Sequence, residues 1–225
     1  WSRSFLGLLT TQFLGALNDN MFRWLVVPLA KEQLAGGDNS AGAALALSVG
    51  LACFVVPYLL FAAPAGYLAD RFSKRKVIVA CKVAEIVLMA VGVAAIALGN
   101  MFLLFGVLFL MGTQSALFGP AKLGALPEML PPRDLSSANG LMGLITILAT
   151  VVGTGVASVL FVATADSTSL RIVASGGALL GVAVVGWLTS LLITPSAPAA
   201  PDRVFPKRFL TAAWSDLRQL FRHAG

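Results

Sequence analysis

The stretch GYLADRFSKRK, residues 66–76, lies between two long apolar runs and decides how the chain is organised. It ends in four closely spaced basic residues, Arg71, Lys74, Arg75 and Lys76. The flanking runs, Ala43–Tyr67 and Val77–Leu98, carry few charges, and each is long enough to cross a bilayer, which takes about 20 apolar residues in a helix. A basic turn between two such runs is typical of a polytopic membrane protein.

The composition of the whole chain agrees with this interpretation. Of its 225 residues, 58% are hydrophobic and 12% are charged, whereas a soluble domain carries about 25% charged residues. The net charge is +6, but the basic residues occur in short clusters between apolar runs. Nucleic-acid binding needs a continuous basic face, so the clustering argues against that function.

Six apolar segments are long enough to span a membrane. They are Ser4–Ala30, Ala43–Tyr67, Val77–Leu98, Met101–Phe118 with an extension to Leu126 left open, Leu135–Val162 and Leu170–Ile193. The runs are continuous instead of alternating, and a barrel strand needs only about 10 residues. Because a segment in lipid must satisfy its own backbone hydrogen bonds, we expect six transmembrane helices and an all-α membrane protein.

The basic residues predict which side of the membrane each connection faces. They gather after the second, fourth and sixth segments, and the other connections hold few of them. The three groups are Arg71, Lys74, Arg75 and Lys76; Lys122 and Arg133; and Arg203, Lys207, Arg208, Arg218 and Arg222. Since loops rich in lysine and arginine stay in the cytoplasm, both termini are predicted to be cytoplasmic.

The composition changes after Ile193, which divides the chain into two predicted parts. Residues 1–194 are expected to form the six-helix bundle, and residues 195–225 follow it. This tail begins as a stiff linker with four prolines, Pro195, Pro198, Pro201 and Pro206. Apolar residues then recur at helical spacing over 209–221, which predicts a short basic amphipathic helix. Two placements of this helix stay open, the inner membrane surface and a further cytoplasmic region.

The first segment carries polar residues at mid-depth, Asn18, Asp19 and Asn20, followed by Arg23. Charges inside a span are costly and are therefore candidates for function. Asp19 and Arg23 are four positions apart, share a helix face and can pair. A structural ion pair is one explanation. We favour a polar site that faces a central cavity, because three consecutive polar residues are hard to place against lipid.

Three further charged residues lie in or beside other segments. Lys82 and Glu85 are three positions apart in the third segment and are expected to form an intramembrane pair with a mainly structural role. Lys122 follows Pro120 at the end of the fourth segment. Its ammonium can snorkel to the lipid headgroups, or it can line an inner vestibule and meet a phosphate.

Small residues mark one face of the fifth segment. Ala149, Gly153 and Ala157 follow one another at steps of four and therefore share a helix face. Such a face allows another helix to approach closely, so we expect it to serve packing.

The residues expected at a catalytic or metal centre are missing from the spans. Cys53 and Cys81 lie inside apolar runs without metal-ligand spacing, and the single histidine, His223, lies in the polar tail. Without a His/Cys cluster or a Ser-His-Asp set, the sequence predicts no enzyme, no metal site and no cofactor.

The basic turn resembles the signature loop of the major facilitator superfamily, Gly-x-x-x-Asp-Arg-x-Gly-Arg-Arg in outline. Gly66, Asp70, Arg71 and Arg75 match it, and Ser73 stands where the signature has glycine. The resemblance implies that the six spans are the N-terminal half of that fold, with a cytoplasmic loop leading to a second six-helix half as a partner. It also implies that the four matching residues form a cytoplasmic gate.

Three other stretches resemble bacterial lysophospholipid transporters of the same superfamily. They are QFLGALNDN (12–20), FGPAKLG (118–124) and ANGLM (138–142), in the expected order. The resemblance implies a multi-pass protein of the bacterial inner membrane that moves a lysophospholipid, such as lysophosphatidylethanolamine, to the cytoplasmic leaflet. In some bacteria such a transporter is fused to phospholipid acyltransferase modules.

The predicted substrate site combines this resemblance with the polar residues in the spans. It consists of Asp19, Asn20, Arg23, Lys82, Glu85 and Lys122. An ammonium group would favour the carboxylate of Asp19, and a phosphate would meet Lys122. By analogy with the superfamily, the first and fourth spans line the cavity, and the two halves rock around a midplane site. The coupling ion stays open between a proton and sodium.

Three alternative functions stay open. Another facilitator of the same fold, such as a drug or metabolite exporter, would be favoured by a cavity dominated by aromatic residues. The membrane part of a fused phospholipid acyltransferase would be favoured by a His-x-x-x-x-Asp motif downstream, which these 225 residues do not contain. A non-transporting scaffold would show no transport in a full-length chain. Membrane lipids are expected partners in every case.

Overall fold

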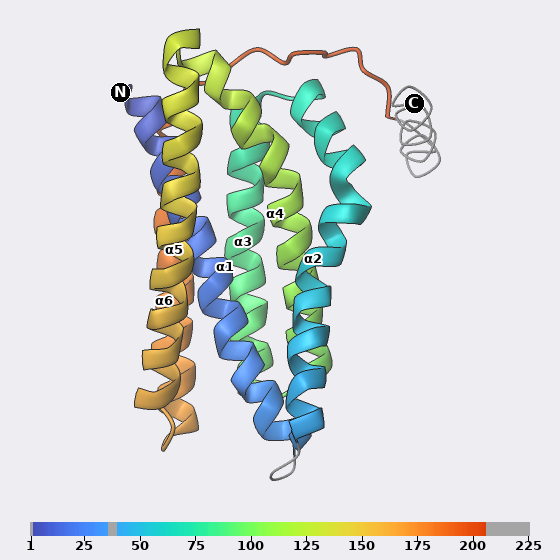
Figure 1. The fold of residues 1–225 in the computed structure, drawn as a ribbon, viewed down its shortest axis with the longest axis vertical. Coiled ribbons are helices and arrows are strands. Elements are labelled where there is room, and N and C mark those ends of the chain that lie inside the picture. The colour runs from blue at the N-terminus through green and yellow to red at the C-terminus, as the bar shows by residue number, and fades with distance from the viewer. Residues whose placement is uncertain (1, 36–39, 206–225) are drawn as a thin grey trace, which may run out of the picture.

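The computed structural model describes residues 2–35 and 40–205, and these residues form a bundle of six long α-helices (Figure 1). The helices are α1 (Arg3–Ala35), α2 (Ser40–Arg71), α3 (Lys74–Leu98), α4 (Met101–Met129), α5 (Leu135–Ala163) and α6 (Thr168–Ser190), with a 3-10 turn at Pro132–Asp134. The expected six-helix, all-α architecture is therefore confirmed. The amphipathic helix predicted within 195–225 lies outside the described residues.

Five of the six helices are long and apolar enough to cross a membrane. The helix that does not meet this description is α1, which carries Asn18, Asp19, Asn20 and Arg23. Its place in the bundle explains how it tolerates them, because α1 contacts each of the other five helices. Neighbouring helices, and not lipid, therefore surround much of its polar surface.

Close helix packing holds α1 against α5. Ala149, Gly153 and Ala157 are buried on one face of α5, as their spacing predicts. A Cβ atom added at Gly153 would lie 2.6 Å from the backbone carbonyl oxygen of Leu17. Because real Cβ atoms do not approach so closely, only glycine permits this crossing.

Two apolar clusters fill the bundle, and a polar layer separates them. In α1, Phe5 and Leu8 belong to one cluster, and the residues from Leu17 to Leu29 contribute to the other. The same order holds in α4, where residues up to Met111 lie in one cluster and those from Phe118 onward lie in the other. The polar side chains of both helices therefore fall near the middle of the bundle.

The two described ends of the chain lie at the same end of the bundle (Figure 1). This end, which we call the linker end, also carries the turn between α2 and α3 and the turn between α4 and α5. Residues 195–205 run across it as an extended linker. The cytoplasmic location of the linker end stays a prediction from the distribution of basic residues.

Candidate functional site

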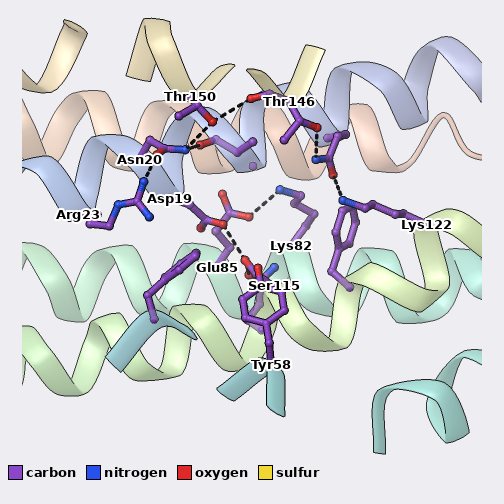
Figure 2. Close-up of a pocket in the computed structure, with 16 residues that line it drawn as sticks. Asp19, Asn20, Arg23, Tyr58, Lys82, Glu85, Ser115, Lys122, Thr146 and Thr150 are labelled. Atoms are coloured by element: carbon purple, nitrogen blue, oxygen red, sulfur yellow. Dashed lines mark hydrogen bonds and ion pairs between the residues drawn. The ribbon is translucent and has the colours of Figure 1, made fainter. Parts of the chain in front are cut away.

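A polar cavity of about 250 Å³ lies in the middle of the bundle, and we call it the central pocket (Figure 2). All of the predicted substrate-site residues line it: Asp19, Asn20, Arg23, Lys82, Glu85 and Lys122. Its other lining residues are Gln12, Gly15, Ala16, Phe54, Tyr58, Gln114, Ser115, Phe118, Thr146 and Thr150. Helices α1 and α4 supply most of this lining, α2, α3 and α5 supply the rest, and α6 supplies none.

Helical spacing explains why α1 contributes so many of these side chains. Gln12, Ala16, Asn20 and Arg23 follow one another at steps of three or four and so share one face. Asn20 Nδ2 donates to the carbonyl oxygen of Ala16 at 2.7 Å and to Thr150 Oγ1 at 3.3 Å. This face of α1 is thereby tied to α5.

Asp19 is held by α4 and not by the arginine of its own helix. Ser115 Oγ donates to Asp19 Oδ2 at 2.6 Å, whereas Oδ1 is buried and has no hydrogen-bond partner among the described residues. Arg23 donates to Asn20 Oδ1, and its guanidinium lies 5.4 Å from the ring centre of Phe54. The Asp19–Arg23 ion pair, which the spacing allowed as one explanation, is not present, because a hydroxyl of α4 contacts Asp19 and the amide of Asn20, one turn away, contacts Arg23.

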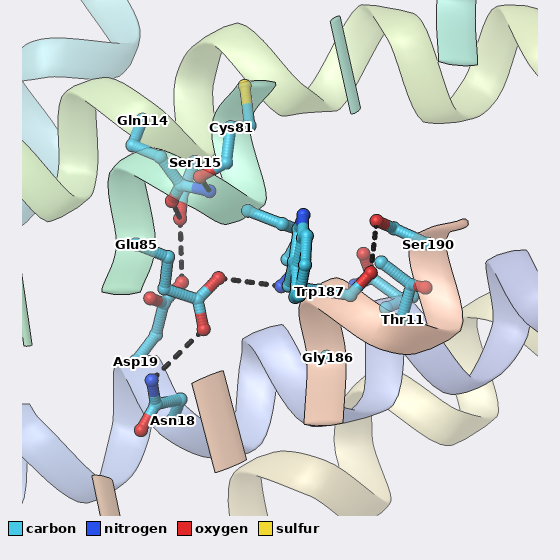
Figure 3. A network of polar contacts seen from close by, with 12 residues as sticks. Thr11, Asn18, Asp19, Cys81, Glu85, Gln114, Ser115, Gly186, Trp187 and Ser190 are labelled. Atoms are coloured by element: carbon cyan, nitrogen blue, oxygen red, sulfur yellow. Dashed lines mark hydrogen bonds and ion pairs between the residues drawn. The ribbon is translucent and has the colours of Figure 1, made fainter. Parts of the chain in front are cut away.

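Lys82 and Glu85 form the buried pair that their spacing predicts. Lys82 Nζ lies 2.6 Å from Glu85 Oε2, and each side chain is only 2% exposed. Glu85 Oε1 also accepts a hydrogen bond of 3.0 Å from Asn18 Nδ2 (Figure 3). The ammonium lies directly against Gly15, where an added Cβ would clash with it. Lys82 therefore does not snorkel, and its charge stays in the bundle.

Lys122 turns into the central pocket (Figure 2). Its Nζ donates to Gln12 Oε1 at 2.9 Å, and Gln12 Nε2 donates to Thr146 Oγ1 at 2.9 Å. The chain of hydrogen bonds joins α4, α1 and α5. Of the two orientations considered for Lys122, the structure shows the one that lines a cavity.

The central pocket thus places groups of both signs around one space. Formally it holds three cations and two carboxylates: Arg23, Lys82, Lys122, Asp19 and Glu85. The opposite charges of Lys82 and Glu85 compensate each other. In the part of the chain that the structure describes, Lys122 donates to a neutral amide and Asp19 keeps one acceptor oxygen without a partner. Such a site can receive a group that carries both a negative and a positive charge.

Several polar lining residues were not assigned to the site from the sequence. They are Gln12, Gln114, Ser115, Thr146 and Thr150. The available signal was their polarity within apolar runs, and for Thr146 and Thr150 also the step of four that places both on one face. Their partners lie on other helices, so spacing within one segment could not reveal the contacts.

The four residues of the expected gate lie apart from the central pocket, at the linker end. Asp70 accepts from the guanidinium of Arg203, and its carbonyl oxygen accepts from Ala200 N–H at 2.8 Å. Arg71 Nη1 donates to the carbonyl oxygen of Arg203 at 2.6 Å. These contacts fasten the linker to the end of α2.

Arg75 and Gly66, the other two residues of the expected gate, differ from Asp70 and Arg71 in their contacts. Arg75 Nη2 donates to the carbonyl oxygen of Leu191, just after α6, at 3.1 Å. An added Cβ at Gly66 would meet nothing within 4 Å. Within the described residues, packing therefore gives no reason for glycine at this position.

In the described part of the chain, no group of three or more His, Cys, Asp or Glu side chains is arranged to hold a metal ion. The two carboxylates of the central pocket instead contact lysine, serine and asparagine side chains.

Comparison with known proteins gives two results. The family model described as Major Facilitator Superfamily matches residues 8–224. Proteins named "Lysophospholipid transporter LplT" from Salmonella newport (strain SL254), Salmonella heidelberg (strain SL476) and Salmonella agona (strain SL483) are each 32% identical to the chain over 161 residues. The matched region covers 71% of the chain and 37% of each relative, so the chain spans well under two thirds of their length.

Proposed function

The chain belongs to the major facilitator superfamily, and we propose that it forms one six-helix half of a secondary transporter for lysophospholipids. The transporter would move its substrate across or between the leaflets of the bacterial inner membrane by alternating access. The observation that carries the proposal is the central pocket, which gathers five charged side chains inside an apolar bundle. The relatives named as lysophospholipid transporters support the choice of substrate.

The charges of the central pocket suit the headgroup of lysophosphatidylethanolamine. Its phosphate would bind Lys122, whose present acceptor is the neutral side-chain amide of Gln12. Its ammonium would bind Asp19 through Oδ1, which is free among the described residues. Asn20 and Arg23 would contribute further hydrogen bonds, and Lys82 and Glu85 would hold the pocket in shape.

Two alternative functions, a drug exporter and the membrane part of an acyltransferase, fit these observations less well. An exporter of drugs would be favoured by a mainly aromatic cavity, whereas the aromatic side chains at the central pocket are Phe54, Tyr58 and Phe118 among sixteen lining residues. The acyltransferase alternative would need residues outside this chain. The polar lining therefore favours an amphiphile with a charged headgroup.

Alternating access needs a second wall for the central pocket, and the arrangement of the helices indicates where it would lie. The pocket is lined by residues of α1, α2, α3, α4 and α5, while α6 contributes none. Large apolar side chains stand exposed on the flanking helices, including Leu59 of α2 and Val151 of α5. A second six-helix half covering this side would complete the cavity, with Asp70 and Arg71 latching the linker end.

The proposal is tested by the variant Asp19→Asn in the full-length protein. Uptake of labelled lysophosphatidylethanolamine into cells is expected to fall to background, because the amide cannot pair with the ammonium group. Asp166→Asn, in the exposed turn after α5, is the matched control and should transport normally. Wild-type uptake by a correctly inserted Asp19→Asn protein would overturn the proposed role of the pocket.

A further inference from the structure

A second cavity, of about 330 Å³, lies at the linker end, and we call it the linker-end cavity. It forms where the start of α1, the start of α3, the end of α4 and the residues just after α6 meet. No residue lines both this cavity and the central pocket. Its volume is within the range of small-molecule sites.

The charges around the linker-end cavity do not cancel. Lys74 Nζ lies 2.8 Å from Glu128 Oε1, and the side chain of Lys74 is only 6% exposed. The opposite charges of this pair compensate each other. Arg3 and Arg75 remain, and neither has an ion-pair partner among the described residues. The cavity therefore carries a surplus of two guanidinium groups.

Hydroxyl groups add hydrogen-bonding capacity to the same wall. Ser4 Oγ accepts from Thr194 N–H at 2.9 Å and donates to Met129 Sδ at 3.5 Å, which ties the start of α1 to the end of α4 and to the segment after α6. Ser2 Oγ accepts from Phe5 N–H at 3.2 Å, and its own proton stays available to an acceptor in the cavity. Guanidinium groups beside a hydroxyl donor suit a phosphate, because a planar guanidinium can donate two hydrogen bonds to two phosphate oxygens.

We propose that the linker-end cavity binds a phosphate group, with Arg3 and Arg75 as its cationic contacts. The cavity lies at the ends of membrane-spanning helices, where lipid headgroups are found, and basic pockets between such helices bind anionic lipid headgroups. A phosphate ion or a soluble phosphate ester offers the same chemistry. The site is independent of substrate binding in the central pocket.

The test measures binding to the full-length protein in a neutral detergent, using dihexanoylphosphatidylglycerol and inorganic phosphate as separate probes at constant ionic strength. Native mass spectrometry gives the number of bound lipids, and microscale thermophoresis gives the dissociation constants. Arg3→Gln is expected to raise the dissociation constant of this site about tenfold, because one charge-assisted contact is lost, and so to lower the fraction of protein that carries the bound lipid. Because the Arg3 side chain has no ion pair to lose within residues 2–35 and 40–205, the variant should fold normally, which circular dichroism checks.

Two control variants make the result specific. Arg133→Gln removes an arginine that is 85% exposed and lies outside the cavity, so both probes should bind it as they bind the wild type. Lys122→Gln alters the central pocket and should leave the Arg3-dependent binding unchanged. Binding of the lipid alone would identify a headgroup site, and binding of both probes would identify a general phosphate site.

Three outcomes would overturn the proposal. The first is that Arg3→Gln binds both probes as tightly as the wild type does, or that the wild type binds neither probe. The second is an equal loss in Arg3→Gln and Arg133→Gln, which indicates diffuse charge. The third is that Lys122→Gln loses the same bound lipid as Arg3→Gln, because this result would place the lipid in the central pocket.

Discussion

At the scale of single residues, Lys82 and Glu85 show what a buried charge requires. Both side chains are almost fully removed from solvent and contact each other at 2.6 Å, while Asn18 adds a hydrogen bond to Glu85. Removing one member of such a pair leaves the other charge buried without compensation. The pair therefore makes stability depend on both residues together.

Glu85→Gln is expected to lower the free energy of unfolding by about 3–5 kcal/mol, because the Lys82 ammonium loses its only carboxylate partner among the described residues. Thermal unfolding in detergent measures the change. The double variant Lys82→Met, Glu85→Met should recover most of the loss, since it buries no charge. Asp134→Asn, from the exposed pair with Arg133, is the control. Equal stability of Glu85→Gln and the wild type would contradict the account.

The sequence was sufficient to select all five charged residues of the central pocket, because charge is rare in an apolar span. It was not sufficient to predict their partners. Asp19 is bound by Ser115, which lies 96 positions away, so the choice between Ser115 and Arg23 depends on how α4 packs against α1. Lys82 and Glu85 were predicted correctly because both partners lie within one turn of one helix.

At the scale of helices, the crossing of α1 and α5 depends on Gly153. An added Cβ would meet the backbone oxygen of Leu17 and lie 3.1 Å from Asn20 Cβ. Backbone cannot move aside as the end of a flexible side chain can. The close approach also places Thr150 of α5 within hydrogen-bonding distance of Asn20, so packing and the central pocket share this crossing.

Gly153→Ala is expected to lower the free energy of unfolding by about 1–3 kcal/mol, because the methyl group forces the two helices apart. Lysophospholipid uptake should fall as well, since Asn20 moves with α1. The matched control is Gly155→Ala, where the new methyl meets nothing within 4 Å. Thermal unfolding and uptake are measured on both variants. Equal losses of stability and uptake in Gly153→Ala and Gly155→Ala would show that the α1–α5 crossing does not require glycine at position 153.

Hydropathy predicted the number of helices and most of their extents, but not every end. We expected the fourth helix to reach Phe118 or Leu126, and α4 continues through Pro120 and Pro127 to Met129. Proline is tolerated in a membrane helix where neighbouring helices or side chains satisfy the freed backbone groups. That compensation comes from tertiary structure and leaves no local pattern in the sequence.

At the scale of the whole molecule, the linker is fastened to the bundle through the signature turn. Asp70 and Arg71 both contact Arg203, and the ring of Phe205 packs edge-on against Tyr67 with 5.0 Å between ring centres. The sequence marked Asp70 and Arg71 as special but gave no sign of Arg203, because the two ends of the contact are separated by the length of four helices.

Asp70→Arg is expected to slow uptake several-fold, because it places two arginines against each other where the linker meets α2. The reversed pair Asp70→Arg, Arg203→Asp should recover a large part of the rate. Stability should change little, since an exposed ion pair contributes only about 0–1 kcal/mol. Arg133→Asp, in the turn between α4 and α5 at the linker end, controls for a general charge effect. If the double variant were as slow as Asp70→Arg, the pairing would have no role in transport.

The most direct measurement of the central claim is the binding of three related lipids to the full-length protein. Lysophosphatidylethanolamine carries a phosphate and an ammonium, its N-acetylated form lacks the ammonium charge, and a monoacylglycerol lacks both. In the wild type each loss should weaken binding. Lys122→Gln should abolish most of the affinity difference between lipids with and without the phosphate. Asp19→Asn should abolish most of the affinity difference between lipids with and without the ammonium charge. Unchanged discrimination in both variants would show that the headgroup binds somewhere other than the central pocket.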